Sequence, residues 1–507
     1  QRGAKLGRTM AHTPAFEVIV LGPNGGPRED SVTGLLVRST STKWSPGSMI
    51  AVDAGTLLAG IIRLLQRHLP MSKDDEGIMT DGPFKGLELP CETAEANAAH
   101  IFREIIGAVL ITHPHLDHIS GLAINTPIIE AGSGPKPVAA LPSVLSAIKN
   151  HMFNDVIWPN LSDEDGGAGL LTYQRLVEGG NPRFGSGDAR GYVRACNGIL
   201  TKCLGVSHGR CKKRYHAETA THHRIGSAVF TADLSMLPSR ALSVDHTDGS
   251  YYSPARSPRH FSGTSNPREP VLATVESSAF FLRDHRTGNE IIVFGDVEPD
   301  SVSMESHNKR VWEAAAPKIA AGTLRAIFIE CSYNDSVDDG YLYGHLCPRH
   351  LVAELMVLAK KVMETRETGS ADRKRKWDAS EPPSEQASPR SKRNQSGSRS
   401  GGSGNPAPRH TPASNVSQSP DLAKDDLVGF GEAARIDDIE VPDPSRWAEA
   451  DPLPLAGLSV YIIHIKEYLT DGPPPGERIL RELRAHGEES HLGCEFFIPT
   501  PSEGIFI

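Results

Sequence analysis

Short apolar runs that end at polar residues or glycines recur along the chain and predict buried β-strands. The first four predicted strands are residues 16–21 (FEVIVL), 35–38 (LLVR), 49–53 (MIAVD) and 108–112 (AVLIT). Apolar residues at helical spacing predict helices within residues 56–69 (TLLAGIIRLLQRHL) and 93–105 (TAEANAAHIFREI). The first part of the chain is therefore expected to contain both strands and helices.

Four later apolar runs each lead into a residue that can do chemistry. They are ILTKCLGVS before His208, EIIVFG before Asp296, LRAIFI before Glu330 and LSVYII before His464. We expect four strands here, each with a histidine or carboxylate at its end.

Two segments lack the apolar content of a folded core. Residues 212–268 are polar with weak periodicity, and residues 366–423 consist largely of Ser, Pro, Gly, Lys and Arg. Chains of the second kind bury too little apolar surface to offset the entropy of ordering. We expect a flexible N-terminus at residues 1–12, followed by a single catalytic domain at residues 13–507. Insertions at 212–268 and 366–423 would interrupt that domain, and the second would be disordered.

Composition narrows the classes of function. The formal net charge of −9 argues against a protein that coats nucleic acid, since such binding depends on Lys and Arg neutralising phosphates. No apolar run approaches the length of a membrane span, and the seven cysteines are dispersed as in reduced cytosolic proteins. We expect a cytoplasmic protein. Basic clusters at residues 373–376 and 390–393 leave nuclear import open, although solvated charge is the simpler reading.

Residues 112–122 (THPHLDHISGL) crowd three histidines and an aspartate onto the end of a predicted strand. Imidazole nitrogens and carboxylate oxygens suit zinc and other borderline divalent ions. A loop that caps the strand can turn His113 and His115 toward one ion, and Asp117 and His118 toward a second. Two adjacent ions can hold a bridging hydroxide that attacks a phosphorus or carbonyl. The pattern therefore predicts a two-metal site.

Further ligands are expected from the other strand ends. His208, Asp296 and His464 each follow a predicted strand, in this order along the chain. Each alone would be an ordinary polar residue at a strand end, but together with residues 113–118 they form one constellation.

The spacing H-x-H-x-D-H, followed by a distant His, Asp and His, resembles the metallo-β-lactamase superfamily. Residues 113–127 (HPHLDHISGLAINTP) resemble more specifically the class II cyclic-nucleotide phosphodiesterases of fungi and some bacteria. Other stretches that fit this family are FNDVIWPNL (153–161), GVSHG (205–209), SSAFFLRD (277–284), FGDVEPDS (294–301), IECSY (329–333), YGHLCPRHL (343–351) and IIHIKE (462–467). The resemblance covers residues from about 16 to 467, and both insertions fall between its motifs.

The resemblance implies an α/β fold of the four-layer αβ/βα sandwich type, with the metals at one edge. It implies two zinc ions, other divalent metals being alternatives. His113, His115 and His208 would bind one ion, Asp117, His118 and His464 would bind the other, and Asp296 would bridge them. Asp117 would also orient the bridging hydroxide.

The resemblance gives catalytic roles to two further residues. Glu330 and His345 stand where related phosphodiesterases keep a Glu and a His near the scissile phosphate. His345 would then protonate the leaving 3′-oxygen or bind a phosphate oxygen, while Glu330 orients it. A salt bridge at the strand end is the alternative for Glu330. Asp53, Gly25 and Gly26 are expected to shape the turns beside the metals.

The implied function is hydrolysis of 3′,5′-cyclic AMP, with cyclic GMP as a second substrate, to the 5′-nucleotide, which lowers cAMP signalling. Two alternatives keep the same fold: an RNA 3′-processing metallo-endonuclease and a metal-less scaffold. The sequence does not decide between cAMP and cGMP, and it leaves the oligomeric state open, a homodimer included.

Overall fold

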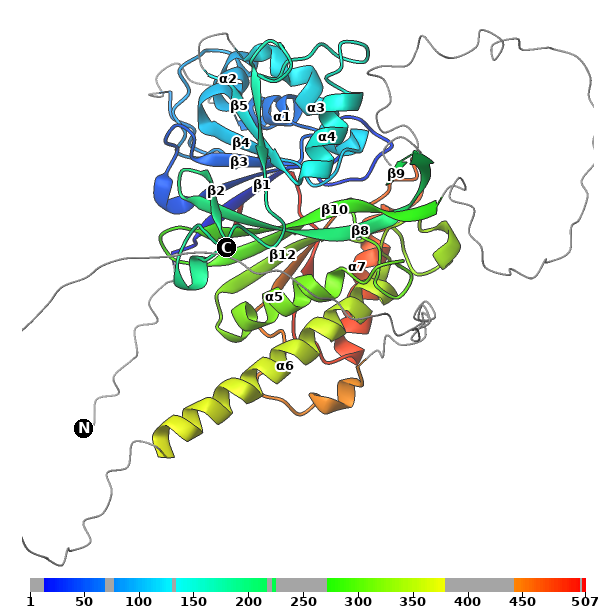
Figure 1. Cartoon of the computed structure of the whole chain (residues 1–507). Helices are drawn as coiled ribbons and strands as arrows, with labels where there is room; N and C mark the ends of the chain where they lie inside the picture. Colours follow the sequence, from blue (N-terminus) through cyan, green and yellow to red (C-terminus); the bar gives the residue numbers. More distant parts are fainter. Residues whose placement is uncertain are drawn as a thin grey trace, which may run out of the picture. The chain divides into compact units, whose positions relative to one another are not determined.

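Two β-sheets pack face to face, and helices cover the outer face of each (Figure 1). This computed structural model describes residues 13–68, 77–129, 134–216, 221–224, 271–378, 442–501 and 504–507. The order of layers is therefore helices, sheet, sheet, helices, which is the α/β sandwich that the family resemblance implied.

The first sheet contains seven strands in the spatial order β15, β1, β2, β3, β4, β5, β6. Their bounds are β1 Phe16–Gly22, β2 Gly34–Ser39, β3 Met49–Val52, β4 Ile106–Leu110, β5 Lys136–Ala140, β6 Leu171–Arg175 and β15 Gly504–Phe506. β3, β4, β5 and β6 are parallel to one another. The carboxyl ends of β3 and β4 consequently meet at one edge of this sheet.

The second sheet has the order β14, β13, β12, β11, β10, β8, β7, with β9 paired to β8. Its strands are β7 Val193–Cys196, β8 Ile199–His216, β9 Thr221–Arg224, β10 Val271–Asp284, β11 Glu290–Phe294, β12 Leu324–Glu330, β13 Ser459–Ile463 and β14 Glu495–Phe497. β11 to β14 run parallel. The carboxyl ends of β11, β12 and β13 therefore also share one edge.

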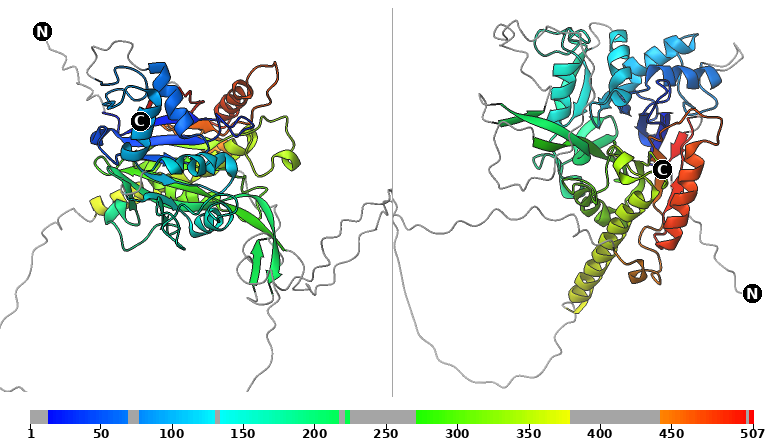
Figure 2. Two further views of the ribbon diagram at one scale, coloured as in Figure 1. Left: turned by 90° about the horizontal axis from the view of Figure 1, so that it is seen from above. Right: turned by 90° about the vertical axis from the view of Figure 1, so that its right-hand side faces the viewer.

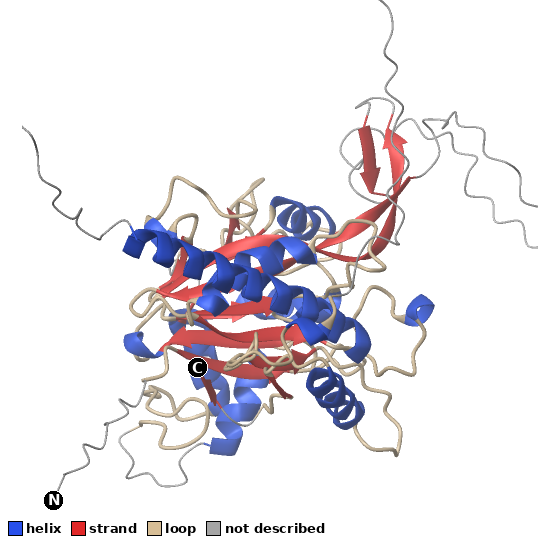
Figure 3. Cartoon of the chain, turned by 90° about the horizontal axis from the view of Figure 1, so that it is seen from below, coloured by secondary structure: helices blue, strands red, loops and turns tan. Residues whose placement is uncertain are grey.

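Seven α-helices accompany the sheets in the described part of the chain. They are α1 Leu58–His68, α2 Ala94–His100, α3 Leu116–Asn125, α4 Pro142–His151, α5 Asn308–Ala320, α6 Pro348–Asp378 and α7 Pro475–Glu489. Figure 3 shows these helices in blue beside the red strands. Within the described ranges, no helix combines the length and apolar character that crossing a bilayer requires.

Side-chain alternation along the second sheet explains why it can be covered on both faces. Phe280 and Leu282 of β10 join the cluster between the two sheets, whereas Ala279 and Phe281 join the cluster under α5 and α6. Successive strand residues point to opposite faces. Both faces are buried, so these strands are nearly continuous apolar runs, and each fully buried large side chain contributes about 1.5–3 kcal/mol.

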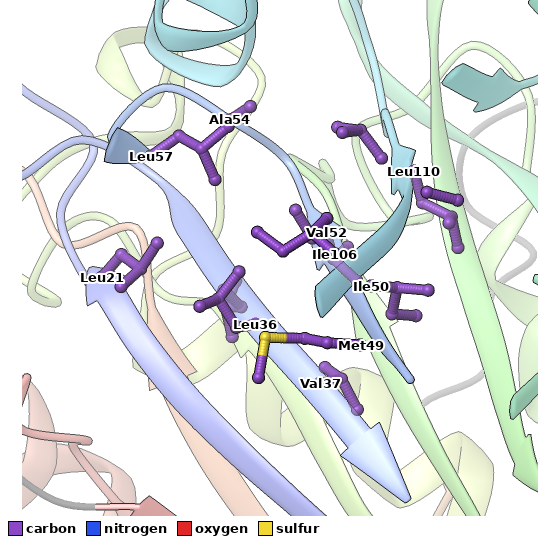
Figure 4. Packing of buried hydrophobic residues seen from close by; sticks show 14 of the residues in the cluster. Leu21, Leu36, Val37, Met49, Ile50, Val52, Ala54, Leu57, Ile106 and Leu110 are labelled. Atoms are coloured by element: carbon purple, nitrogen blue, oxygen red, sulfur yellow. The ribbon is translucent and has the colours of Figure 1, made fainter. Parts of the chain in front are cut away.

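The first sheet contributes apolar side chains from both of its faces to the same cluster, which extends to α1, α2 and α3. Figure 4 shows Val52 and Leu110 of β3 and β4, Leu36 of β2, and Leu57, which precedes α1. Leu36 pairs with Ala51, so it points to the face opposite that of Val52. β15 forms one edge of this sheet, since it pairs antiparallel with β1 through Val18 opposite Ile505. The last residues therefore lie beside the first strand (Figure 2).

The structure agrees with the predicted strands and helices in the first part of the chain but changes the bounds of both insertions. β8 continues to His216 and β9 spans Thr221–Arg224, so the start of the predicted insertion at 212–268 is strand. β8 extends this far because it pairs with β10 over most of its length. The periodicity of one strand alone did not reveal this pairing. Residues 225–268 lie outside the described residues.

The second predicted insertion begins inside a helix. α6 continues from Pro348 to Asp378, so residues 366–378 are helical, and residues 379–423 lie outside the described residues. The chain divides into one unit of residues 1–367 and 439–507 and another of residues 368–438. The first unit holds both sheets. The predictions for residues 1–12 also lie outside the described residues.

Candidate active site

The sheet edges bring together side chains that are far apart in the sequence. Asp296 follows β11, Glu330 ends β12 and His464 follows β13, all at the same edge of the second sheet. Asp53 and His113 follow β3 and β4 at the carboxyl edge of the first sheet. Contacts with one carboxylate join the two edges, because Nε2 of His113 and of His118 lie 3.6 Å and 3.2 Å from oxygens of Asp296.

The HPHLDH segment changes from extended loop to helix in the middle of the cluster. His115 is the N-cap of α3, which begins at Leu116 and so places Asp117 and His118 in its first turn. A carboxylate in that turn interacts favourably with the positive end of the helix dipole. The His113 and His118 rings lie 4.1 Å apart between centroids, and the His113 and His115 rings lie 4.5 Å apart. His115 is exposed, whereas His113 and His118 are fully buried.

His208 does not end its strand as predicted but lies inside β8. The register with β10 shifts there, because Ser207 pairs with Glu276 and Arg210 pairs with Thr274. Two residues of β8 thus oppose one of β10, which is a β-bulge, and bulges redirect side chains. Gly209 has a positive φ of 71°, a conformation that suits glycine.

A close contact between two glycines fixes the bulge of β8 against the loop that contains His345. Gly344 has φ 86°, and a Cβ added to it would lie 2.7 Å from the Gly209 nitrogen. The Gly344 carbonyl accepts a hydrogen bond from His208 Nδ1 at 2.7 Å. A side chain at position 344 would therefore push this loop away from β8.

Asp296 is the centre of the site, with 2% of its surface exposed. Its Oδ1 lies 3.2 Å from His118 Nε2 and 3.3 Å from His464 Nε2. Its Oδ2 lies 3.6 Å from both His113 Nε2 and His208 Nε2. Both carboxylate oxygens therefore face imidazole nitrogens, and these come from three segments: residues 113–118, β8 and the loop after β13.

Two ligand groups share this carboxylate. His113, His115, His208 and Asp296 form one, and Asp117, His118, Asp296 and His464 form the other, with candidate ligand atoms within 4.8 Å of one another in each. These are the two sets implied by the family resemblance, and all seven predicted ligand residues are brought together. A third group joins His208 and Asp296 to Glu330 and His345.

Hydrogen bonds at Nδ1 of His113 and His118 leave Nε2 of each ring beside Asp296. His118 Nδ1 lies 2.8 Å from Asp53 Oδ2, and His113 Nδ1 lies 3.1 Å from Thr112 Oγ1, which itself donates to Asp53. An N–H at Nδ1 is the tautomer that satisfies these contacts, and it leaves the Nε2 lone pair free. In the described protein, His113 Nε2, His118 Nε2 and Asp296 Oδ1 are buried without a hydrogen bond.

Electrostatics keep several of these histidines neutral. Burial lowers the pKa of His113 well below its usual value, and burial lowers the pKa of His208 to about 4. Burial opposes the charge of Asp296, but His464, His118 and His113 hold its pKa well below the usual range. Burial opposes a charge on His118 too, but the carboxylates beside it raise its pKa well above the usual value. A divalent cation binds imidazoles in their neutral form, so it would take the place of a proton on this ring, and an ionised carboxylate among imidazoles with unpaired nitrogens is its donor set. The residues therefore fit a metal centre.

His464 is held by contacts on two sides. Its ring lies against Gly25, where an added Cβ would approach His464 Cε1 to 2.5 Å. Its Nδ1 lies 3.1 Å from Ser332 Oγ, and Ser332 donates to Glu330 Oε2 at 2.6 Å. His464 Nε2 lies 3.2 Å from Asp117 Oδ2. Its pKa is lowered by burial, as expected for a neutral ligand.

Glu330 and His345 form a buried pair next to the centre. Glu330 Oε1 lies 2.9 Å from His345 Nδ1 and also accepts the Val297 N–H at 2.7 Å. Burial disfavours the His345 cation, but the charge and hydrogen bond of Glu330 outweigh it and raise the pKa of His345. The His345 ring lies 4.9 Å from the His208 ring and 5.1 Å from the His464 ring. The predicted salt bridge and the predicted proximity to the site thus occur together.

Sequence reasoning expected Asp53 and Gly25 to shape turns and gave no role to Thr112, Ser332 or Lys466. Asp53 has φ 56° and accepts hydrogen bonds from the Thr112 backbone and side chain as well as from His118. Its position directly after a buried strand was the available signal. Ser332 and Lys466 lie two residues from Glu330 and His464, but nothing in their spacing indicated a contact with the site.

Comparisons with known proteins find a matching family model, several relatives and a similar solved structure. A family model described as class-II cAMP phosphodiesterases matches residues 17–174 and 257–370. The matched residues include the HPHLDH segment, Asp296, Glu330 and His345, whereas His208 and His464 fall outside them.

Among relatives, a 3′,5′-cyclic-nucleotide phosphodiesterase of Schizosaccharomyces pombe is 30% identical over 349 residues, covering 69% of this chain and 76% of the relative. The 3′,5′-cyclic-nucleotide phosphodiesterase 1 of Saccharomyces cerevisiae is 26% identical, covering 67% and 82%. The structure of unliganded yeast PDE1 is similar with a TM-score of 0.57 and 21% identity, covering 97% of this chain and 100% of that one. That structure therefore has the same type of fold as the one described above.

Proposed function

Because the chain belongs to the class-II cAMP phosphodiesterase family, we propose that it hydrolyses 3′,5′-cyclic nucleotides to 5′-nucleotides. The observation that carries the proposal is the convergence of the predicted metal ligands on Asp296, beside the Glu330 and His345 pair. The RNA-processing alternative is not favoured, since the relatives named above are cyclic-nucleotide phosphodiesterases. Burying polar atoms that make no hydrogen bond costs free energy, and a protein that binds no metal would not recover it. The metal-less scaffold is therefore disfavoured as well.

We propose two zinc ions as the resident metals. His113, His115 and His208 would hold one, Asp117, His118 and His464 would hold the other, and Asp296 would be shared. When bound, two divalent ions supply a nucleophile at neutral pH and stabilise charge on the entering and leaving oxygens. The contacts of Asp53, Thr112 and Ser332 hold the imidazole rings in the orientation that this task requires.

The remaining chemistry falls to side chains that can hold or move a proton. Asp117 is the most exposed carboxylate of the site, at 26%, and can orient the attacking water. His345 donates a proton to the leaving 3′-oxygen, and Glu330 keeps its ring in position and its cation stable. Since Nδ1 of His345 contacts Glu330, Nε2 is the nitrogen left to donate the proton. The cytoplasmic location and a homodimer stay predictions.

The proposal is tested by assaying the metal-loaded protein on cAMP, cGMP and a 3′-extended tRNA. We expect 5′-AMP or 5′-GMP from the cyclic nucleotides and no cleavage of the tRNA. Formation of 3′-nucleotides would contradict the assigned leaving group, and tRNA cleavage without cyclic-nucleotide turnover would favour the RNA-processing alternative.

Removal of the metals is expected to abolish activity reversibly. Two ligand groups around one carboxylate predict close to two ions per chain, measured by elemental analysis of active protein. Dialysis against a strong chelator should remove both turnover and metal, and added Zn²⁺ should restore turnover. Active protein with one ion or none would contradict the two-metal site.

Asp53→Asn is expected to weaken metal binding by roughly 10- to 100-fold, the usual cost of losing a carboxylate behind a histidine ligand. The amide cannot serve as an anionic acceptor for His118 Nδ1. Competition with a chelator measures the affinity, and unfolding of the metal-free protein measures any loss of fold stability. Asp188→Asn, at an exposed site, is the control. An unchanged metal affinity in Asp53→Asn would show that His118 needs no support.

A further inference from the structure

Lys466 places an ammonium group beside the metal site without belonging to the ligand set. Its Nζ lies 3.7 Å from Asp117 Oδ2 and donates to the Gly25 carbonyl at 2.6 Å. Its side chain is 23% exposed, so solvent still reaches the side chain beside the site.

The backbone holds Lys466 in a fixed place. The Lys466 N–H donates to the Ser332 carbonyl at 3.1 Å. On either side, Gly25 N donates to Ile465 O and Glu467 N donates to Gly26 O, both at 3.0 Å. The residues after β13 are thus bonded to two loops of the site, which leaves the side chain little freedom in where it can point.

These backbone bonds also argue against a purely structural task for the ammonium. The loop that contains Gly25 is already joined to the residues after β13 by Gly25 N, His464 N and Glu467 N. The bond from Lys466 Nζ to the Gly25 carbonyl adds one contact to a connection that exists without it. An ammonium has three N–H donors, and Gly25 uses one of them.

The charge of the substrate gives the ammonium a task. A cyclic nucleotide has one negative phosphodiester group, and attack on its phosphorus adds charge to the non-bridging oxygens. Charge-assisted hydrogen bonds to such oxygens are strong, and lysine is a common phosphate ligand. Asp117, beside which Nζ lies, is the carboxylate that orients the attacking water under the proposed function. An oxygen of the same phosphate is then expected close to both.

We propose that Lys466 binds a non-bridging oxygen of the substrate phosphodiester and is a catalytic residue of this site. The assignment rests on the proposed function for the identity of the substrate. The chemistry that it requires is that of a phosphate oxyanion next to the metal centre.

Inorganic phosphate and 5′-AMP are the probes, and their binding to metal-loaded protein is measured by calorimetry, which needs no turnover. Lys466→Met removes the charge and keeps a side chain of similar length. It is expected to weaken the binding of both probes by roughly 10- to 100-fold, the usual effect of losing a hydrogen bond to a charged group. Lys466→Arg keeps the charge and should retain most of the affinity. Lys361→Met is the matched control, since Lys361 is 27% exposed and pairs with Glu313 instead.

The metal content and the thermal unfolding midpoint of each variant are measured alongside. Phosphate binding in Lys466→Met equal to the wild type would overturn the proposal, and so would a loss of metal or of stability that accounts for the weaker binding. An equal loss in Lys361→Met would reduce the effect to overall charge. If wild-type protein binds phosphate through Lys466 but does not hydrolyse cyclic nucleotides, the proposed function fails and the phosphate site stands.

Discussion

Asp296→Asn is expected to lower cyclic-nucleotide turnover by at least ~10⁴-fold and to release bound metal. Four histidine nitrogens lie within 3.6 Å of its two carboxylate oxygens. The amide has a similar shape but no charge and only one acceptor oxygen, so it cannot serve both ligand groups. Metal ions supply several kcal/mol of transition-state stabilisation, and each 1.36 kcal/mol is tenfold in rate. Steady-state kinetics and elemental analysis measure the two effects.

Asp284→Asn is the matched control for this variant. Asp284 is also buried at the end of a strand, but it accepts hydrogen bonds from Thr287 and Ser39 and lies opposite Ile199 at the start of β8. Its replacement should cost about 1–3 kcal/mol of unfolding free energy and leave metal content and turnover of the folded protein intact. If Asp296→Asn retained two ions per chain and normal rates, the centre of the site would have to be assigned elsewhere.

His345→Ala is expected to lower turnover of cAMP by roughly 10²- to 10⁴-fold while the metals stay bound. The 3′-alkoxide is a poor leaving group near neutral pH, so a proton must reach it as the bond to phosphorus breaks. Glu330, 2.9 Å from His345 Nδ1, raises the pKa of His345 and so keeps the cation available as the donor. Initial rates and metal analysis of the variant measure both parts of the expectation.

A substrate with an acidic leaving group separates proton donation from phosphate binding. A p-nitrophenyl phosphodiester needs little protonation, so His345→Ala should lose much less activity on it than on cAMP. Equal losses on the two substrates would assign His345 to phosphate binding. Loss of a metal ion would make His345 a ligand, in keeping with the third ligand group that contains it.

The strands that supply the site were predictable because both of their faces are buried. β11, β12 and β13 are short apolar runs, and such runs stand out against the polar loops around them. The residue after each run could therefore be named from the sequence. The spacing of His113, His115, Asp117 and His118 predicted a metal site, and the family resemblance added the proposed partition of ligands between two ions.

What the sequence did not reveal depends on contacts between distant segments. The bulge at His208 is a feature of the pairing of β8 with β10. The polar residues in the second half of β8 gave no sign that the strand continues there. Lys466 and Asp117 are 349 positions apart in the sequence, and they come into contact only because the edges of the two sheets meet. The Gly209 and Gly344 contact likewise joins residues whose individual patterns carry no signal.

The order of the ligands along the chain has a consequence for biosynthesis. His464 and Lys466 follow β13, which comes after α6, whereas the HPHLDH segment precedes α3. During synthesis from the N-terminus, a nascent chain that has reached α6 still lacks the last predicted ligand and the phosphate-binding ammonium. It also lacks β15, the partner of β1. Early folding of the first half therefore yields no competent centre, and the free energy of metal binding is added only to a chain that has been synthesised almost to its last strand.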